Sequence, residues 1–206
     1  MARSFQHSPL ALAILALLYE APMHPYEMQR LIKERGKDEV INVRQRASLY
    51  QVIERLLREG FISVLETTRA ENRPERTVYA LTAAGRETAL RWLREMIAVP
   101  EREYPDFPSA LAQLALLTPD DARQQLASRA AALQGEQDRV EELLRGAAAF
   151  LPRLFVLETE YQLRVLEVEL AWVRALVADL ADGTLTWDEA EIRNLAAELS
   201  PVKGGE

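Results

Sequence analysis

The order of apolar patterns in the first hundred residues is the feature that most constrains the fold of this chain. Three segments have helical spacing, two β-prone runs follow, and a further helical segment comes last. The helical segments start at Pro9, Pro25 and Arg46, the β-prone runs cover 61–65 and 77–81, and the last helix covers 82–98. Three helices, a two-stranded wing and a fourth helix are the plan of a winged helix-turn-helix domain. The sequence therefore predicts such a domain over residues 1–99.

Each predicted helix of this domain carries apolar residues at intervals of three and four, which places them on one face. These residues are Leu10, Ile14, Leu17 and Leu18, then Met28, Leu31 and Ile32, then Leu49, Ile53 and Leu56, and finally Leu90, Leu93 and Ile97. Ser8 and Thr82 are suited to cap the first and last helices. Gly36 and Gly60 follow the second and third helices, where a positive φ is favoured.

Residues 100–206 contain no pattern typical of a strand and are predicted to be all helical. Three prolines mark a linker over 99–108, and helices are expected over 109–117, from Pro119 to about Leu144, and over 152–181. The last of these has two apolar stripes on nearly opposite sides. One stripe holds Leu163, Leu166, Leu170, Val173, Val177 and Leu180, and the other holds Tyr161, Val165, Val168, Trp172 and Leu176. A helix with two apolar faces needs two partners, so a second chain or the first domain is expected beside the neighbouring helix.

Charge separates the same two halves. The chain of 206 residues has a formal net charge of -7, but residues 1–99 hold 15 Lys and Arg against 12 Asp and Glu, whereas residues 100–206 hold 10 against 20. Only the first half, at +3, suits a polyanionic partner such as DNA. We therefore predict a mainly α protein with a small β-wing, divided into a DNA-binding domain (1–99) and an antiparallel helical dimerisation domain (100–206).

Composition excludes several other classes of protein. Cysteine is absent and only two histidines occur, which leaves no disulfide framework, no Cys or Cys/His zinc site and no thiol catalysis. The longest apolar run is far shorter than the ~20 residues of a membrane span, and no leader sequence is recognised. We expect a cytoplasmic protein without membrane contact, without a cofactor or metal, and without the phosphate loop or nucleophile elbow of an enzyme.

Several short motifs, in this order, make the chain resemble the PadR family of bacterial transcriptional regulators. They are His24-Pro25-Tyr26-Glu27, Ser48-Leu49-Tyr50, Leu56-Leu57-Arg58-Glu59-Gly60-Phe61-Ile62 and Tyr79-Ala80-Leu81-Thr82-Ala83-Ala84-Gly85-Arg86. The resemblance covers nearly the whole length. It implies a homodimer that binds double-stranded operator DNA, with a helical C-terminal half that dimerises and helps to form a pocket for a small, often aromatic effector.

Polar residues opposite the apolar face of the third helix are the candidate DNA-binding residues. Gln51, Arg55 and Arg58 lie on that side, with Ser48 and Tyr50 at its edge. Gln suits adenine, Arg suits guanine or phosphate, and Ser suits either. Further arginines before the helix and around the wing suit the DNA backbone or minor groove: Arg44, Arg46, Arg69, Arg73 and Arg76. The alternative interpretation is a solvated helix face and a merely soluble hairpin.

Four aromatic residues are candidates for contact with an effector where domains or subunits meet: Trp92, Tyr104, Phe107 and Trp172. Tryptophans at helical spacing are more often packing residues, and that alternative stays open. The function predicted from these observations is a two-fold-symmetric repressor that a small effector releases from its operator. A winged-helix adaptor that binds a protein instead of DNA is the alternative.

Overall fold

The computed structural model describes residues 8–41, 46–68 and 76–199. The chain divides into two compact units, Met1–Arg102 and Glu103–Glu206. Both are built mainly from helices, and a single two-stranded sheet occurs in the described part of the first unit. The predicted fold class, mainly α with a small β-wing, is confirmed.

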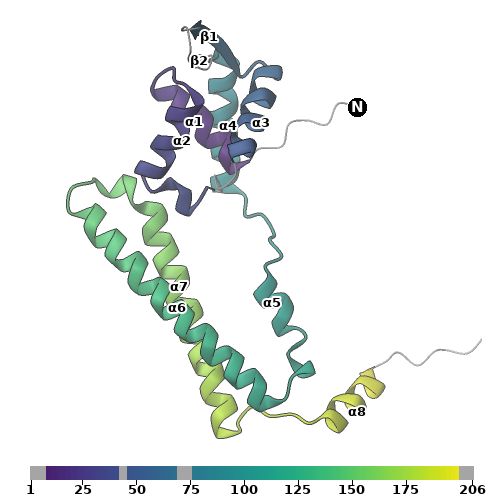
Figure 1. Cartoon of the computed structure of the whole chain (residues 1–206). Helices are drawn as coiled ribbons and strands as arrows, with labels where there is room; N and C mark the ends of the chain where they lie inside the picture. The colour runs from purple at the N-terminus through teal and green to yellow at the C-terminus, as the bar shows by residue number, and fades with distance from the viewer. Residues whose placement is uncertain (1–7, 42–45, 69–75, 200–206) are drawn as a thin grey trace, which may run out of the picture. The chain divides into compact units, whose positions relative to one another are not determined.

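The elements of the first unit follow the predicted order (Figure 1). They are α1 (Pro9–Glu20), α2 (Pro25–Glu34), the 3-10 turn η1 (Lys37–Glu39), α3 (Arg46–Arg58), β1 (Ile62–Thr68), β2 (Arg76–Leu81) and α4 (Ala83–Ala98). α1 contacts α3, α4 and β2, so it forms the centre of the unit.

The helix ends of the first unit are fixed by local chemistry. The Ser8 hydroxyl accepts a hydrogen bond from the Ala11 amide at 3.1 Å, and Pro9 occupies the first turn of α1. His24 caps α2 in the same way, because its Nδ1 accepts from the Tyr26 amide at 3.1 Å. The Thr82 hydroxyl accepts from the Gly85 amide at 3.0 Å at the start of α4.

The predicted inward faces of the first three helices are confirmed. Ile14, Met28, Ile53 and Leu56 are almost completely buried in one core cluster. α4 turns a different face inward, since Trp92 lies in this core, whereas Leu90, Leu93 and Ile97 remain exposed. The apolar spacing of α4 therefore marks a surface that the first unit does not cover by itself.

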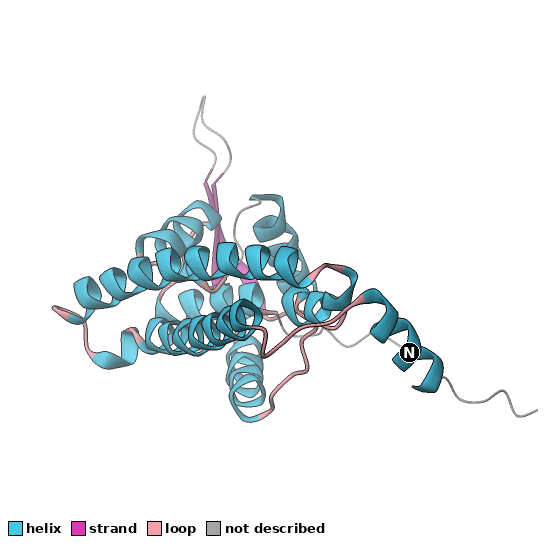
Figure 2. Ribbon diagram, turned by 90° about the horizontal axis from the view of Figure 1, so that it is seen from below, coloured by secondary structure: helices cyan, strands magenta, loops and turns pink. Residues whose placement is uncertain are grey.

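β1 and β2 form one narrow antiparallel hairpin (Figure 2). The register pairs Ile62 with Leu81 and Val64 with Tyr79, and a bulge lies between Val64 and Glu66. Gly60, with φ of 73°, turns the chain from α3 into β1. Met23 pairs with Tyr79, so the segment between α1 and α2 covers the other edge of β2.

The second unit is built on two long helices. α6 and α7 run side by side in antiparallel directions (Figure 1). Its elements are α5 (Asp106–Leu111), η2 (Leu114–Leu116), α6 (Pro119–Ala148), η3 (Arg153–Phe155), α7 (Leu157–Asp182) and α8 (Glu189–Leu199). Where one helix was expected over 109–117, the structure has two short pieces, α5 and η2. α5 starts earlier than expected, with Pro105 at its N-cap position and Pro108 accommodated in its first turn.

The two apolar stripes of α7 have different surroundings in the second unit. The inner stripe packs against α6, with Val173 and Leu180 buried beside Ala122 and Leu126. Most of the outer stripe faces solvent, and Val168 and Trp172 are 71% and 49% exposed, whereas Leu176 is half-buried against the same core cluster as Val173. One of the two predicted partners of α7 is therefore α6, and the other is not supplied by this unit.

Candidate nucleic-acid interface

The outward face of α3 is polar and rests on a rigid base. Leu49, Ile53 and Leu56 are buried in the core of the first unit and hold the helix in place. Gln51 and Arg58 are exposed on the other side, and neither side chain makes a hydrogen bond to another described residue. Arg55 is exposed beside them. The structure thus brings together the three side chains that sequence reasoning placed on this face.

The remaining candidates lie around this face or outside the described residues. Tyr50 is exposed and Ser48 is half-buried near the start of α3. Arg46 is the first residue of α3, and Arg76 is the first residue of β2. Three further candidates lie outside the described residues: Arg44, Arg69 and Arg73.

The side chain of Tyr79 on β2 lies close enough to α3 to be influenced by charges on that helix. Burial raises the pKa of its hydroxyl above the ordinary value, and the charges of Glu54 and Tyr50 act in the same direction. Sequence reasoning used Tyr79 only as part of the wing, and its position against α3 depends on strand register, which no local pattern specifies.

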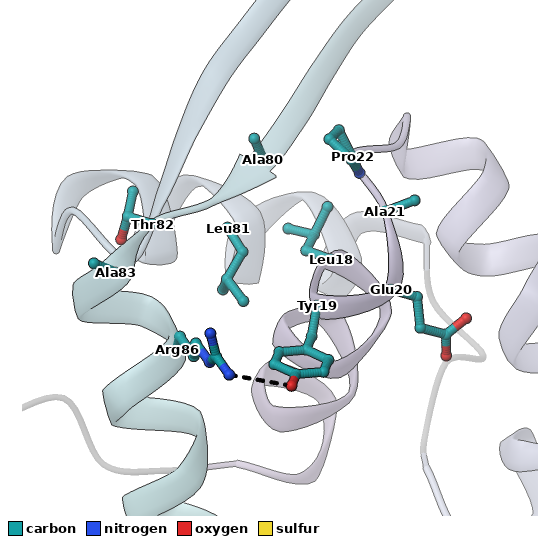
Figure 3. Close-up of a pocket in the computed structure, with 10 residues that line it drawn as sticks. All are labelled: Leu18, Tyr19, Glu20, Ala21, Pro22, Ala80, Leu81, Thr82, Ala83 and Arg86. Carbon is teal, nitrogen blue, oxygen red and sulfur yellow. Dashed lines mark hydrogen bonds between the residues drawn. The ribbon is translucent and has the colours of Figure 1, made fainter.

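An open pocket of about 640 Å³ lies in the first unit between the end of α1, the end of β2 and the start of α4 (Figure 3). Arg86 closes one side, where its guanidinium carbon lies 5.1 Å from the centroid of the Tyr19 ring and Nη2 donates to the Tyr19 hydroxyl at 3.3 Å. No residue of α3 lines this pocket. It is separate from the polar face of α3.

The four aromatic effector candidates occupy different environments. Trp92 is 4% exposed and packs edge-to-face on Phe61, with ring centroids 5.8 Å apart. A ligand would reach it only by displacing core side chains, so here it serves as a packing residue. Tyr104 is largely exposed. Phe107 and Trp172 are brought together, with centroids 6.4 Å apart and ring planes at 78°.

Sequence reasoning missed two residues of the second unit. Arg129 of α6 lies over the Phe107 ring, with its guanidinium carbon 3.5 Å from the ring centroid. Trp187, after α7, donates its indole N–H to the Leu117 carbonyl at 2.9 Å. An arginine among helical acids resembles a solvated residue, and Trp187 lies in a segment without strong periodicity, so neither gave a usable signal.

Within the described ranges, no helix is both long and apolar enough to cross a bilayer.

Comparisons with solved structures identify the fold. Bacillus subtilis PadR in complex with operator DNA is 19% identical, with a TM-score of 0.66, and the match covers 84% of this chain and 99% of that chain. The same regulator in complex with p-coumaric acid is 18% identical, with a TM-score of 0.69, over 84% and 98% of the two chains. The virulence activator AphA of Vibrio cholerae is 19% identical, with a TM-score of 0.65, over 84% and 98%.

No curated protein sequence gives a significant match to the chain. Residues 14–91 match the model of the transcriptional regulator PadR-like family. These residues run from α1 into α4 and include the whole of α3 and the described parts of the wing. The matched segment, and with it the winged-helix domain of this chain, is therefore similar to the PadR-like family of transcriptional regulators.

Proposed function

We propose that the chain is a homodimeric regulator of transcription that binds operator DNA sequence-specifically through α3. The observation that carries the proposal is the polar outward face of α3, with Gln51, Arg55 and Arg58 exposed above a buried base. A recognition helix needs this combination, because base readout requires side chains held in register by a rigid scaffold. The shared fold with Bacillus subtilis PadR, solved in complex with operator DNA, supports it.

Position along α3 suggests separate roles for the three side chains. Residues near the N-terminus of a recognition helix reach base edges, and residues further along meet the DNA backbone. Gln51 lies in the first half of α3, and its amide can form a bidentate pair with adenine. Arg58 is the last residue of α3, so we assign it to a phosphate.

The outer stripe of α7 supplies the dimer interface in this proposal. Tyr161, Val165, Val168 and Trp172 repeat at intervals of four, three and four and are exposed in the second unit. Such spacing forms a seam that packs against a helix. A second copy of α7 is the partner that we infer, because two-fold dimers present the same surface from both subunits.

Dimerisation would place two α3 helices on successive major grooves of a pseudo-palindromic operator, about one helical turn apart. A dimer bound across that DNA excludes other proteins from it, which is the physical basis of the proposed repression. A small effector that binds one arrangement of the dimer better than the other would lower operator affinity by a population shift. Phe107 and Trp172 remain the candidate effector residues that lie together.

The alternative is a winged-helix adaptor that binds another protein. Its supporting observation is the exposed apolar face of α4, where Leu90, Leu93 and Ile97 meet solvent and Ile97 is 78% exposed. A protein partner could cover this face. The adaptor would need no affinity for DNA.

Variants of α3 test the DNA-binding proposal. Gln51→Ala should lower discrimination at one base pair of each half-site by about 1–3 kcal/mol, because the bidentate pair is lost. Arg58→Ala should weaken binding to all DNA sequences alike, and the slope of log affinity against log salt should become shallower by about one unit per subunit. Fluorescence anisotropy with operator and single-base variants measures both effects.

Gln124→Ala and Arg145→Ala are matched controls on exposed positions of α6 and should leave binding unchanged. If Gln51→Ala weakens every sequence to the same degree, its assigned role in base readout is wrong. Unchanged DNA binding in both α3 variants would show that α3 is not the recognition helix.

A further inference from the structure

A pocket of about 410 Å³ lies in the second unit between the α5–η2 segment and the first half of α6. Leu111, Leu114 and Leu117 line it from one side, and Ala122 and Leu126 line it from α6. The α6 residues are buried, whereas the three leucines are only half-buried. The pocket volume is in the range of small-molecule sites, and a bound apolar molecule would remove this leucine surface from water.

Arg129 lines this pocket and is paired with Glu169. The Nε and Nη2 groups of Arg129 both donate to the same Glu169 carboxylate oxygen, with an Nε distance of 2.9 Å. Its Nη1 group makes no hydrogen bond to any residue that the structure describes. Because Glu169 balances the charge of Arg129, the pocket offers N–H donors without net positive charge.

The surroundings of the pocket favour a neutral ligand over an anion. Residues 100–206 carry 20 Asp and Glu against 10 Lys and Arg, so the second unit repels anions at long range. Phe107 lines the pocket and is held in place by two contacts, since Arg129 lies over its ring and Trp172 makes an edge contact with it. An aromatic ligand is favoured because its ring can pack against this fixed aromatic side chain.

We propose that this pocket binds a neutral, mainly apolar molecule of one or two rings that carries one acceptor oxygen for Arg129. The acceptor would take the Nη1 hydrogens, and the rings would pack on Phe107 and the leucines. This site lies wholly within the second unit. Ligand binding by this pocket does not depend on the proposed function. Only the assignment of the pocket as the effector site rests on that function.

The place of α5 in the chain gives the pocket a route to regulation. α5 is the first helix after α4, and residues 99–105 join the two. A ligand beneath α5 would hold this end of the connection more tightly against α6. It would thereby favour those arrangements of the dimer in which α5 is docked.

The test is isothermal titration calorimetry on the full chain without DNA, using 2-acetylnaphthalene as the neutral probe and 2-naphthoate as the anionic probe. We expect saturable binding of the ketone at one site per chain, with a Kd at least tenfold lower than that of the carboxylate. Saturable binding of the carboxylate with the lower Kd would overturn the assignment to a neutral ligand. No binding of either probe would overturn the site.

Two pairs of variants locate the binding. Ala110 lines the pocket and Ala112 does not, and both are exposed. Ala110→Trp should fill the pocket and weaken ketone binding at least tenfold, whereas Ala112→Trp should change it less than twofold. Arg129→Met should weaken it severalfold, and the control Arg174→Met, which removes a different α6–α7 hydrogen bond, should not. Equal effects within both pairs would contradict the location.

Val168→Glu places a charge in the exposed outer stripe of α7 and is expected to prevent dimerisation, so titration of this variant separates a small ligand from a second copy as the occupant. We expect the ketone to bind this variant and the dimer alike. Binding to the monomer alone would show that a second chain fills the pocket, which overturns the proposal. DNA binding of the ligand-free protein is measured separately, so failure of the pocket and failure of the proposed function are distinguishable.

Discussion

Val168→Glu should convert the dimer into a monomer and lower operator affinity by about 10²–10⁴-fold. Val168 is 71% exposed in the second unit and lies in the middle of the outer stripe of α7. A carboxylate there would be buried without a partner in the proposed interface, which is strongly unfavourable. In the dimer, binding of one subunit to its half-site raises the effective concentration of the other subunit at the second half-site. A monomer lacks this effect, and its affinity for the operator is lower. Light scattering after size-exclusion chromatography measures the mass.

Ala178→Glu is the matched control, because Ala178 is also exposed on α7 but lies off the outer stripe. It should remain dimeric and bind the operator normally. A dimeric Val168→Glu protein would place the subunit interface elsewhere.

Gly85→Ala should destabilise the first unit by about 3 kcal/mol and lower its unfolding midpoint by roughly 10 °C or more. A Cβ atom at this position would lie 1.9 Å from the Phe61 carbonyl oxygen and 2.9 Å from Leu81 Cδ1. The obstruction is backbone at the start of the wing, so it cannot rotate away. The same Phe61 carbonyl accepts hydrogen bonds from the Thr82 amide and hydroxyl at 3.1 and 3.0 Å. Moving it would disturb the cap of α4.

Gly135→Ala is the control for this experiment. A Cβ atom at Gly135, within α6, meets nothing within 4 Å. Because alanine favours a helix interior over glycine, this variant should gain about 0.5–1 kcal/mol. Thermal unfolding followed by circular dichroism compares the two. A Gly85→Ala midpoint within 1 °C of the parent protein would contradict the close approach of α4 to Phe61.

Local patterns were sufficient to predict the architecture of the first unit. Leu49, Ile53 and Leu56 repeat with helical spacing and are all buried, which fixes Gln51, Arg55 and Arg58 on the outward face. Capping residues also mark real boundaries, since Ser8 and Thr82 each accept the hydrogen bond that starts a helix. These features depend on residues close in sequence, and a single sequence therefore reveals them.

Features that depend on distant contacts were not predictable in the same way. The apolar spacing of α4 suggested that Leu90, Leu93 and Ile97 form its buried face. Trp92 occupies the core instead, where its ring packs on Phe61, a residue that follows α3 in the sequence. The pocket beneath α5 depends on Arg129 meeting Phe107 and Glu169 across three segments of the second unit. Spacing along one helix contains no information about such a meeting.

Operator binding is measured by titrating the full chain with DNA from upstream of its own gene at several salt concentrations, with a shuffled fragment as competitor. We expect sequence-specific binding with two chains per site and an affinity that falls steeply as salt rises, because each phosphate contact releases counterions. Absence of sequence-specific binding at every salt concentration would contradict the proposed function and favour the adaptor.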